Sequence, residues 1–236
     1  IAMHVSSETH PLVVICGYGP GVSHAVAQQW ARSGYRLALV ARNREKLDKA
    51  AAQFKVEGIE AHAYSANLAD PEAVTRTIAQ IEADLGAIST LHWNAFTYAA
   101  GNLLEATTVE LQSLLDITLH GFFAAVRAAL SGLRAQKGEV LVTGGGFGFF
   151  DDEVDAFVAR IGAMGGAVAK AALHKAVGVL HQKLAADDVY VGEVVINSMV
   201  KNTSFEDSTS TLLPETVAAM FWDLHMSRKA VSITTI

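Results

Sequence analysis

The sequence has little cysteine, no excess of positive charge and no long apolar run, and each shortage excludes a class of protein. Cys16 is the single cysteine among 236 residues, so a disulfide framework and any zinc or iron–sulfur site built from several thiolates are excluded. Eighteen basic residues against 24 acidic ones give a net charge of −6. Binding to nucleic acid or to an anionic membrane requires a basic face, so we predict neither partner.

The apolar runs are also too short to span a bilayer. The best candidate, Gly121–Leu133, carries Arg127 and falls below the roughly 18 residues that a spanning helix needs. The first residues contain no basic region followed by a hydrophobic stretch, so we expect no secretory signal. With 51% hydrophobic and 18% charged residues, the composition is that of a folded globular chain, and we predict a cytoplasmic protein.

Short apolar runs alternate with longer stretches of helical period along the whole chain. The run Leu12–Cys16 is continuously hydrophobic, as in a strand covered on both faces. We expect further strands at 36–41, 61–66, 90–93, 139–143, 190–196 and 230–236, helices at 22–33, 44–57, 71–85, 109–135, 165–186 and from 214, and loops at 144–157 and 201–213. Strand–helix repetition implies parallel pairing through right-handed crossovers. We therefore predict one domain over residues 1–236, a Rossmann-like, doubly wound α/β/α fold with a parallel sheet of about seven strands.

A glycine-rich turn follows the first expected strand. The turn Gly17–Gly21 lies between that strand and a helix, which is where ligands bind in open α/β sheets. Glycines let the backbone approach a pyrophosphate, and the helix N-terminus supplies free N–H groups and a partial positive charge. The strict G-x-G-x-x-G spacing is broken by Val22, so a plain strand–helix turn is the alternative. The position in the first βα unit favours a nucleotide.

The end of the second expected strand indicates which nucleotide binds. An acidic residue that binds the ribose is expected roughly 20 residues beyond the turn, but Ala41 occupies that position. Arg42 follows directly, with Arg44 nearby. Arginine presents a planar fork of donors that suits a phosphate dianion. We therefore predict NADP(H) rather than NAD(H), the alternative being two solvated arginines at a helix start.

Together these residues resemble the short-chain dehydrogenase/reductase family over residues 12–236. The family's Gly-xxx-Gly-x-Gly turn falls on Gly17, Gly21 and Ser23, and its active-site helix resembles AKAALHKAVGVLHQKLA at 169–185, where Lys170 takes the place of the family's lysine. The resemblance implies a small carbonyl or alcohol substrate, no metal, and a homodimer or homotetramer built through the two long helices. The cofactor contacts that it implies are Gly17, Tyr18, Gly19, Pro20, Gly21, Val22, Arg42, Asn43, Asn67, Leu68, Asn94, Ala95, Phe96, Lys170 and Thr203.

The chain departs from the family at the catalytic positions. The family's tyrosine, four residues before the lysine, falls on Gly166, its serine after strand five on Gly145 and its helix asparagine on Thr118, so only Lys170 remains. We therefore expect a divergent member that lacks the catalytic tyrosine and serine. It would be either an oxidoreductase with atypical or weakened proton donation, or a catalytically silent dinucleotide-binding protein that acts as a sensor or partner subunit.

Several other side chains could serve the site, and each also has an ordinary structural interpretation. Thr143 and Tyr98 carry hydroxyl groups near the expected cleft, and His174 lies one turn beyond Lys170, with His181 two turns further. The segment 149–162 resembles an insertion at the substrate cleft. In this segment or just before it lie the remaining candidates, an acidic cluster and three aromatic residues: Asp151, Asp152, Glu153, Asp155, Phe147, Phe149 and Phe150. The segment 201–213 is expected to be a loop on the substrate side.

Overall fold

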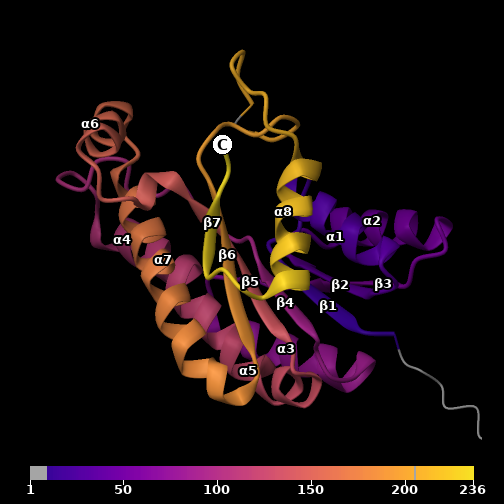
Figure 1. Cartoon of the computed structure of the whole chain (residues 1–236). Coiled ribbons are helices and arrows are strands. Elements are labelled where there is room, and N and C mark those ends of the chain that lie inside the picture. Colours follow the sequence, from indigo (N-terminus) through magenta and orange to yellow (C-terminus); the bar gives the residue numbers. More distant parts are fainter. Residues whose placement is uncertain (1–9, 205) are drawn as a thin grey trace, which may run out of the picture.

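Seven parallel strands form one sheet in the order β3-β2-β1-β4-β5-β6-β7. The computed structural model describes residues 10–204 and 206–236, with helices on both faces of this sheet (Figure 1). Residues 1–9 of the predicted domain and residue 205 of the predicted loop lie outside the described residues. The predicted doubly wound fold is confirmed. The strands are β1 Leu12–Cys16, β2 Arg36–Ala41, β3 Ala61–Ser65, β4 Thr90–Trp93, β5 Glu139–Gly145, β6 Tyr190–Ile196 and β7 Ser232–Thr234.

The strand register brings the functional edge of the sheet together. Cys16, the last residue of β1, pairs with Val40 on one side and with Trp93, the last residue of β4, on the other. The strand order reverses between β1 and β4, and the carboxyl ends of the strands at such a switch point border the crevice in which ligands of this architecture bind. The turns that follow β1 and β4 therefore meet at one place.

The two faces of the sheet are covered by different helices because side chains alternate along each strand. Val14 lies in a core with residues of α3, α5 and α7, whereas its neighbour Ile15 lies in a second core with residues of α1, α2 and α8. The α-helices are α1 Val22–Arg32, α2 Arg44–Val56, α3 Pro71–Leu85, α4 Thr108–Leu115, α5 Gly121–Gln136, α6 Asp152–Ile161, α7 Met164–Leu184 and α8 Pro214–Ser227.

The expected loop at 144–157 is wrong in its second half, because helix α6 starts inside it. The Asp151 side chain accepts hydrogen bonds from the backbone N–H groups of Glu153 (2.9 Å) and Val154 (3.1 Å), which caps the helix. The helix ends at Gly162, whose φ of 68° is left-handed. An N-cap aspartate and a C-terminal glycine were both visible in the sequence, but the glycine-aromatic run before them favoured a loop.

The single long helix expected at 109–135 is interrupted in its middle. A π-helical turn, Asp116–His120, separates α4 from α5 and carries the buried Thr118. The next residue, Gly121, packs so tightly against the carbonyl oxygen of Leu68 that a Cβ atom would collide with it. Such π segments often occur at functional sites. Here the π turn occupies the position at which the family's helix asparagine was expected.

The combined helix Thr108–Gln136 is the one helix of the described residues that is long and apolar enough to cross a membrane by length and composition. The uninterrupted apolar run within this helix, Gly121–Leu133, is shorter than a bilayer requires, so the sequence alone predicts no spanning helix. Buried residues make up 44% of the most apolar window, and Phe122, Ala125 and Ala129 of α5 lie in the core beneath the sheet. A core helix in an α/β layer passes the same test of length and composition.

Candidate functional site

The turn between β1 and α1 contains two structural glycines and one that faces open space. Gly17 and Gly21 have φ values of 84° and 92°, which favour glycine. A Cβ on Gly17 would lie 2.6 Å from the backbone nitrogen of Ala95, and one on Gly21 would lie 2.7 Å from Cγ2 of Thr203. A Cβ on Gly19 would meet nothing within 4 Å. The turn is thus packed against Ala95 at its first glycine and against Thr203 at its last, and its middle residue, Gly19, faces open space.

Ser23, which stands where a third glycine was expected, fixes the shape of this turn. Its hydroxyl accepts a hydrogen bond from the backbone N–H of Gly19 (2.9 Å) and donates one to the carbonyl oxygen of Gly19 (3.0 Å). Among the described residues, no side chain caps the N-terminus of α1, which begins after Gly21. The first N–H groups of a helix lack partners within the helix, so this end of α1 suits an anion.

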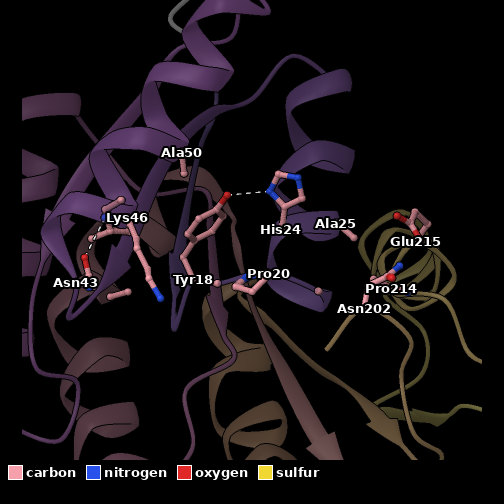
Figure 2. A pocket seen from close by; sticks show the side chains of 14 residues that line it. Tyr18, Pro20, His24, Ala25, Asn43, Lys46, Ala50, Asn202, Pro214 and Glu215 are labelled. Carbon is pink, nitrogen blue, oxygen red and sulfur yellow. Dashed lines mark hydrogen bonds between the residues drawn. The ribbon is translucent and has the colours of Figure 1, made fainter. Parts of the chain in front are cut away.

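A pocket of about 510 Å³ lies beside the turn, between α1, α2 and the segment that leads into α8 (Figure 2). It brings together five predicted cofactor residues, Tyr18, Gly19, Pro20, Gly21 and Asn43. The residues that sequence reasoning missed come from α1, from the end of β2, from α2 and from the chain around α8: His24, Ala25, Ala41, Lys46, Leu47, Ala50, Asn202, Pro214 and Glu215. The other predicted cofactor residues do not line this pocket.

Lys46 is the cationic side chain of this pocket. It extends from the first turn of α2 alongside Tyr18 (Figure 2) and forms no ion pair with a carboxylate of the described residues. Asn43 caps α2 by accepting a hydrogen bond from the backbone N–H of Lys46 at 3.0 Å. The predicted Arg42 is exposed and lies between two lining residues, Ala41 and Asn43, without lining the pocket itself. No local sequence pattern singles out Lys46, because its place at the pocket depends on how α2 packs against the glycine-rich turn.

Tyr18 and His24 form a neutral pair at the pocket wall. The Tyr18 hydroxyl lies 2.8 Å from Nδ1 of His24 (Figure 2). Burial raises the pKa of Tyr18 to about 12. Burial also lowers the pKa of His24, although the carboxylates of Glu57 and Glu215 act in the opposite direction. At neutral pH the phenol is therefore protonated and the imidazole uncharged, and Lys46 and Glu215 are the charged groups of the lining.

The segment after β4 is tied to the same turn. The backbone N–H of Asn94 donates to the carbonyl oxygen of Cys16 at 2.8 Å, and its side-chain amide donates to the carbonyl oxygen of Gly17 at 3.3 Å. Ala95 is buried against Gly17. The predicted Leu68 is buried after β3, and Asn67 accepts a hydrogen bond from its own loop at Ala69 N–H (3.1 Å). Asn94, Ala95 and Thr203 thus surround the glycine-rich turn, whereas Asn67 and Leu68 lie beyond β3.

Lys170 occupies the other end of the crevice, on α7. Its ammonium donates to the carbonyl oxygen of Thr143 at 2.9 Å and lies 5.6 Å from the ring centroid of Phe96. Its aliphatic stem passes 3.3 Å from where a Cβ on Gly145 would be. Burial lowers the pKa of Lys170 to about 8, and the nearby carboxylate of Glu193 acts in the opposite direction. A Cβ on Gly166, one turn earlier, would meet nothing within 4 Å.

The two candidate hydroxyls near Lys170 differ in their surroundings. The Thr143 hydroxyl is buried and has no hydrogen-bond partner in the described part of the chain. Tyr98 is 65% exposed, and its ring packs against Phe96 in an edge-to-face arrangement with 5.2 Å between the centroids. Burial of part of the ring raises the pKa of Tyr98 to about 12. Phe96 therefore contacts both side chains, the Tyr98 ring through an edge-to-face contact and the Lys170 ammonium through its ring face.

Three of the remaining candidates have structural partners. His181 pairs with the carbonyl oxygen of Val191 at 2.8 Å, and Asp151 caps α6. Phe147 packs against Phe157, and Phe150 is fully exposed. Within residues 10–204 and 206–236, no group of three or more histidine, cysteine, aspartate or glutamate side chains is arranged to hold a metal ion.

Comparisons with known proteins agree on one family. A profile described as short chain dehydrogenase matches residues 11–211. A 3-oxoacyl-[acyl-carrier-protein] reductase of Staphylococcus aureus is 22% identical over 216 residues, which are 91% of this chain and 83% of the relative. The human 3-oxoacyl-[acyl-carrier-protein] reductase is 32% identical over 131 residues, covering 56% of this chain and 54% of that protein.

Solved structures share the fold over nearly the whole chain. A blue fluorescent protein from a metagenomic library, in complex with NADPH, superimposes with a TM-score of 0.84 at 20% identity, covering 95% of this chain and 96% of that one. An alcohol dehydrogenase from the archaeon Thermococcus sibiricus, complexed with 5-hydroxy-NADP, gives a TM-score of 0.81 at 22% identity and covers 96% of each chain.

Proposed function

The chain belongs to the short-chain dehydrogenase family, and on this basis we propose that it is an NADP(H)-dependent oxidoreductase. It transfers a hydride to or from a small carbonyl or alcohol, with a proton donor that differs from the usual one. The observation that carries the proposal is the pocket at the glycine-rich turn, which has an open Gly19 at one wall and the Lys46 ammonium at another. Solved structures with the same fold include NADP and NADPH complexes, which supports this cofactor.

The residues present fit a phosphorylated dinucleotide. Gly19–Gly21 and the uncapped end of α1 would hold the pyrophosphate, because these backbone N–H groups suit an anion. Arg42 and Lys46 would hold the 2′-phosphate, which distinguishes NADP(H) from NAD(H). Leu68 would cover the adenine, and Thr203 would meet the nicotinamide end. When bound, the cofactor supplies or accepts the hydride.

The proposed peculiarity of this site concerns the proton. We place Gly145 and Gly166 where the family has its serine and tyrosine, so neither position offers a hydroxyl. A carbonyl that accepts a hydride needs a proton on its oxygen, and a positioned acid typically contributes about 10²–10⁴ in rate. Lys170 is the protonatable side chain that remains beside Gly145.

A second candidate function is a catalytically silent dinucleotide-binding protein, either a sensor or a partner subunit. The open space at Gly166 favours it, because no side chain fills the place from which a proton would be delivered. Both candidates share the cofactor pocket and differ only in turnover.

Two measurements on the purified protein test these candidates. Calorimetric titration should give a lower Kd for NADPH than for NADH, and equal affinities or no heat with either would overturn the cofactor proposal. NADPH consumption at high protein concentration, over a panel of ketones, aldehydes and quinones, then separates the enzyme from the silent protein. Turnover that Lys170→Ala abolishes supports the enzyme, and tight NADPH binding without turnover supports the silent protein.

We also propose that the protein is a homodimer or homotetramer. The exposed apolar side chains Val168 and Val179 on α7 support an interface along this helix. A monomer in light scattering at micromolar concentration would contradict it. We further propose that the segment 201–213 covers the substrate, since its Thr203 contacts the glycine-rich turn at Gly21.

A further inference from the structure

A buried carboxylate lies behind the proposed catalytic lysine. Glu193, on β6, is fully buried. One of its oxygens, Oε2, is 2.5 Å from Nδ1 of His174 on α7 and accepts a hydrogen bond from the hydroxyl of Ser232 on β7 at 3.1 Å. The other oxygen, Oε1, is buried and has no hydrogen-bond partner among the residues that the structure describes. A carboxylate is costly to bury without full pairing, so the position calls for a functional explanation.

The glycines after β5 make room for this carboxylate and for the lysine. A Cβ on Gly144 would collide with Oε1 of Glu193, and a Cβ on Gly145 would press against the stem of Lys170. Gly144 therefore leaves room for the Glu193 carboxylate, and Gly145 leaves room for the Lys170 side chain. On α7, His174 lies four residues beyond Lys170 and hence on the same face of the helix. The glutamate, the histidine and the lysine form one cluster against the end of β5.

The groups that face Lys170 come from four directions. Thr143 presents its carbonyl oxygen from β5, and Phe96, against which Tyr98 packs, presents its ring face. His174 lies one turn further on α7, and Glu193 on β6 supplies the negative charge that acts on the ammonium. Burial among these groups favours a neutral amine, and the glutamate favours the charged form.

We propose that Glu193 is a positioning residue that keeps Lys170 protonated, and that Lys170 gives its proton to the substrate oxygen across the space left open at Gly166. This inference rests on the proposed oxidoreductase function and deepens it. The side chain of His174 is 42% exposed, so it connects the buried carboxylate with solvent. In this arrangement the Lys170 ammonium takes the place of a hydroxyl as proton donor, and the Glu193 carboxylate keeps that ammonium charged.

The step balances without any further reactant. As the substrate carbonyl carbon accepts a hydride, the C=O π bond breaks and its electron pair moves onto the oxygen. That oxygen takes a proton from Nζ of Lys170, so an O–H bond forms, an N–H bond breaks and the nitrogen keeps its pair as a neutral amine. The substrate is reduced and the cofactor is oxidised. Lys170 then regains a proton from water, and in the direction of alcohol oxidation the neutral amine accepts the proton instead.

The test measures the titration of Lys170 directly in the protein without cofactor. Competitive labelling with acetic anhydride from pH 6 to pH 11, read by mass spectrometry, gives the midpoint for Lys170, with the exposed Lys175 of the same helix as internal reference. We expect a midpoint near 8 in the wild type. In Glu193→Gln we expect it to fall by about one pH unit or more, because an opposite charge has been removed.

Matched variants make the result specific. Glu193→Asp keeps the charge and should keep the midpoint close to that of the wild type. Glu139→Gln removes the other buried strand glutamate that pairs with a histidine, and it should leave Lys170 unchanged. If Glu193→Gln does not fold, the wild type still decides, since a midpoint near the ordinary lysine value of about 10.4 would overturn the proposal.

The failure of this inference can be told apart from failure of the proposed function. An unchanged Lys170 midpoint in folded Glu193→Gln, together with normal NADPH binding, would overturn the role of Glu193 alone. Absence of NADPH binding in the wild type would overturn the cofactor proposal whatever the lysine titration shows. Where turnover is measurable, the kcat for carbonyl reduction should fall as pH rises through about 8, and in Glu193→Gln it should fall at lower pH with little change in KM.

Discussion

Two strand glutamates of this protein are equally buried, and both pair with a histidine, yet their surroundings differ. Glu139, at the start of β5, has partners on both oxygens. Oε1 meets Nδ1 of His225 (2.6 Å) and the Thr90 hydroxyl (2.9 Å), and Oε2 meets Arg228 (3.4 Å). The two hydrogen-bond donors to Glu193 both meet Oε2, and within residues 10–204 and 206–236 none meets Oε1. The satisfied carboxylate lies at the amino end of the sheet, whereas the half-satisfied one belongs to the middle of β6 and places its Oε1 next to Gly144, near the carboxyl end of β5. Ligands of this architecture bind at the carboxyl ends of the strands.

This difference shows that a buried carboxylate can either stabilise the fold or serve a functional site. A buried carboxylate with a full set of donors stabilises the local structure, and it loses that role if a partner is removed. A buried carboxylate with an unpaired oxygen contributes less to the stability of the fold. Such unsatisfied buried groups are found mainly at functional sites. The predictions below test this contrast between Glu139 and Glu193, and the roles of the groups around the crevice.

The largest expected effect is on turnover. Lys170→Ala removes the proposed proton donor, so the rate of carbonyl reduction should fall by about 10²–10⁴. Lys170→Arg keeps a cation but cannot release a proton near neutral pH, so it should be impaired to a similar degree. Steady-state NADPH oxidation measures both. Retention of full activity by Lys170→Arg would show that the lysine binds without exchanging a proton.

The next effect is on stability. Glu139→Ala leaves Arg228 and His225 without their buried partner, and we expect a loss of about 3–5 kcal/mol in the free energy of unfolding, measured in urea. Glu193→Gln keeps the shape of the side chain and both donors can still find an oxygen, so it should change that free energy by less than about 1 kcal/mol. Equal losses for the two variants would remove the contrast between the two glutamates.

A smaller effect is expected at the opposite end of the crevice. Arg42→Ala and Lys46→Ala should each raise the Kd for NADPH by about tenfold, because a charge-assisted contact to a phosphate is lost. The Kd for NADH, which has no 2′-phosphate, should stay within twofold. Calorimetry with both coenzymes provides its own control. A parallel loss of NADH affinity would mean that these side chains shape the pocket without reading the phosphate.

The smallest effect is expected for the exposed phenol. Tyr98→Phe should change kcat by less than about twofold, because the ring keeps its contact with Phe96 and the hydroxyl takes no part in proton transfer. A loss of 10² or more would identify Tyr98 as the donor and would assign Lys170 a binding role.

Much of the fold could be predicted because each element carries its own local signal. The buried run LVVIC gave β1 its bounds of Leu12–Cys16, and Asp70-Pro71 gave α3 its start. The glycine-rich turn and Lys170 could also be placed on the expected elements. Helix α6 was missed although its cap was visible, because the preceding glycines and aromatic residues favoured a loop. The π turn depends on a tertiary contact between Gly121 and Leu68, which no local pattern contains.

The parts of the site that could not be predicted depend on distant partners. Glu139 and Glu193 each stand in an apolar strand, and a strand glutamate alone gives no sign of what it meets. Their histidines are 86 and 19 residues away in the sequence. Lys46 follows a similar logic, since only the packing of α2 against the turn shows that its ammonium reaches the pocket. Chemistry that depends on long-range pairing becomes visible only once the sheet is assembled.

A crystal structure of the complex with NADPH tests the central claim most directly. We predict that the 2′-phosphate lies within hydrogen-bond distance of Arg42 and Lys46, and that Nζ of Lys170 is the protonatable side-chain atom nearest to the nicotinamide ring. A map in which the phosphate meets neither cation, or in which the hydroxyl of Tyr98 reaches the ring while Lys170 stays away from it, would contradict the claim.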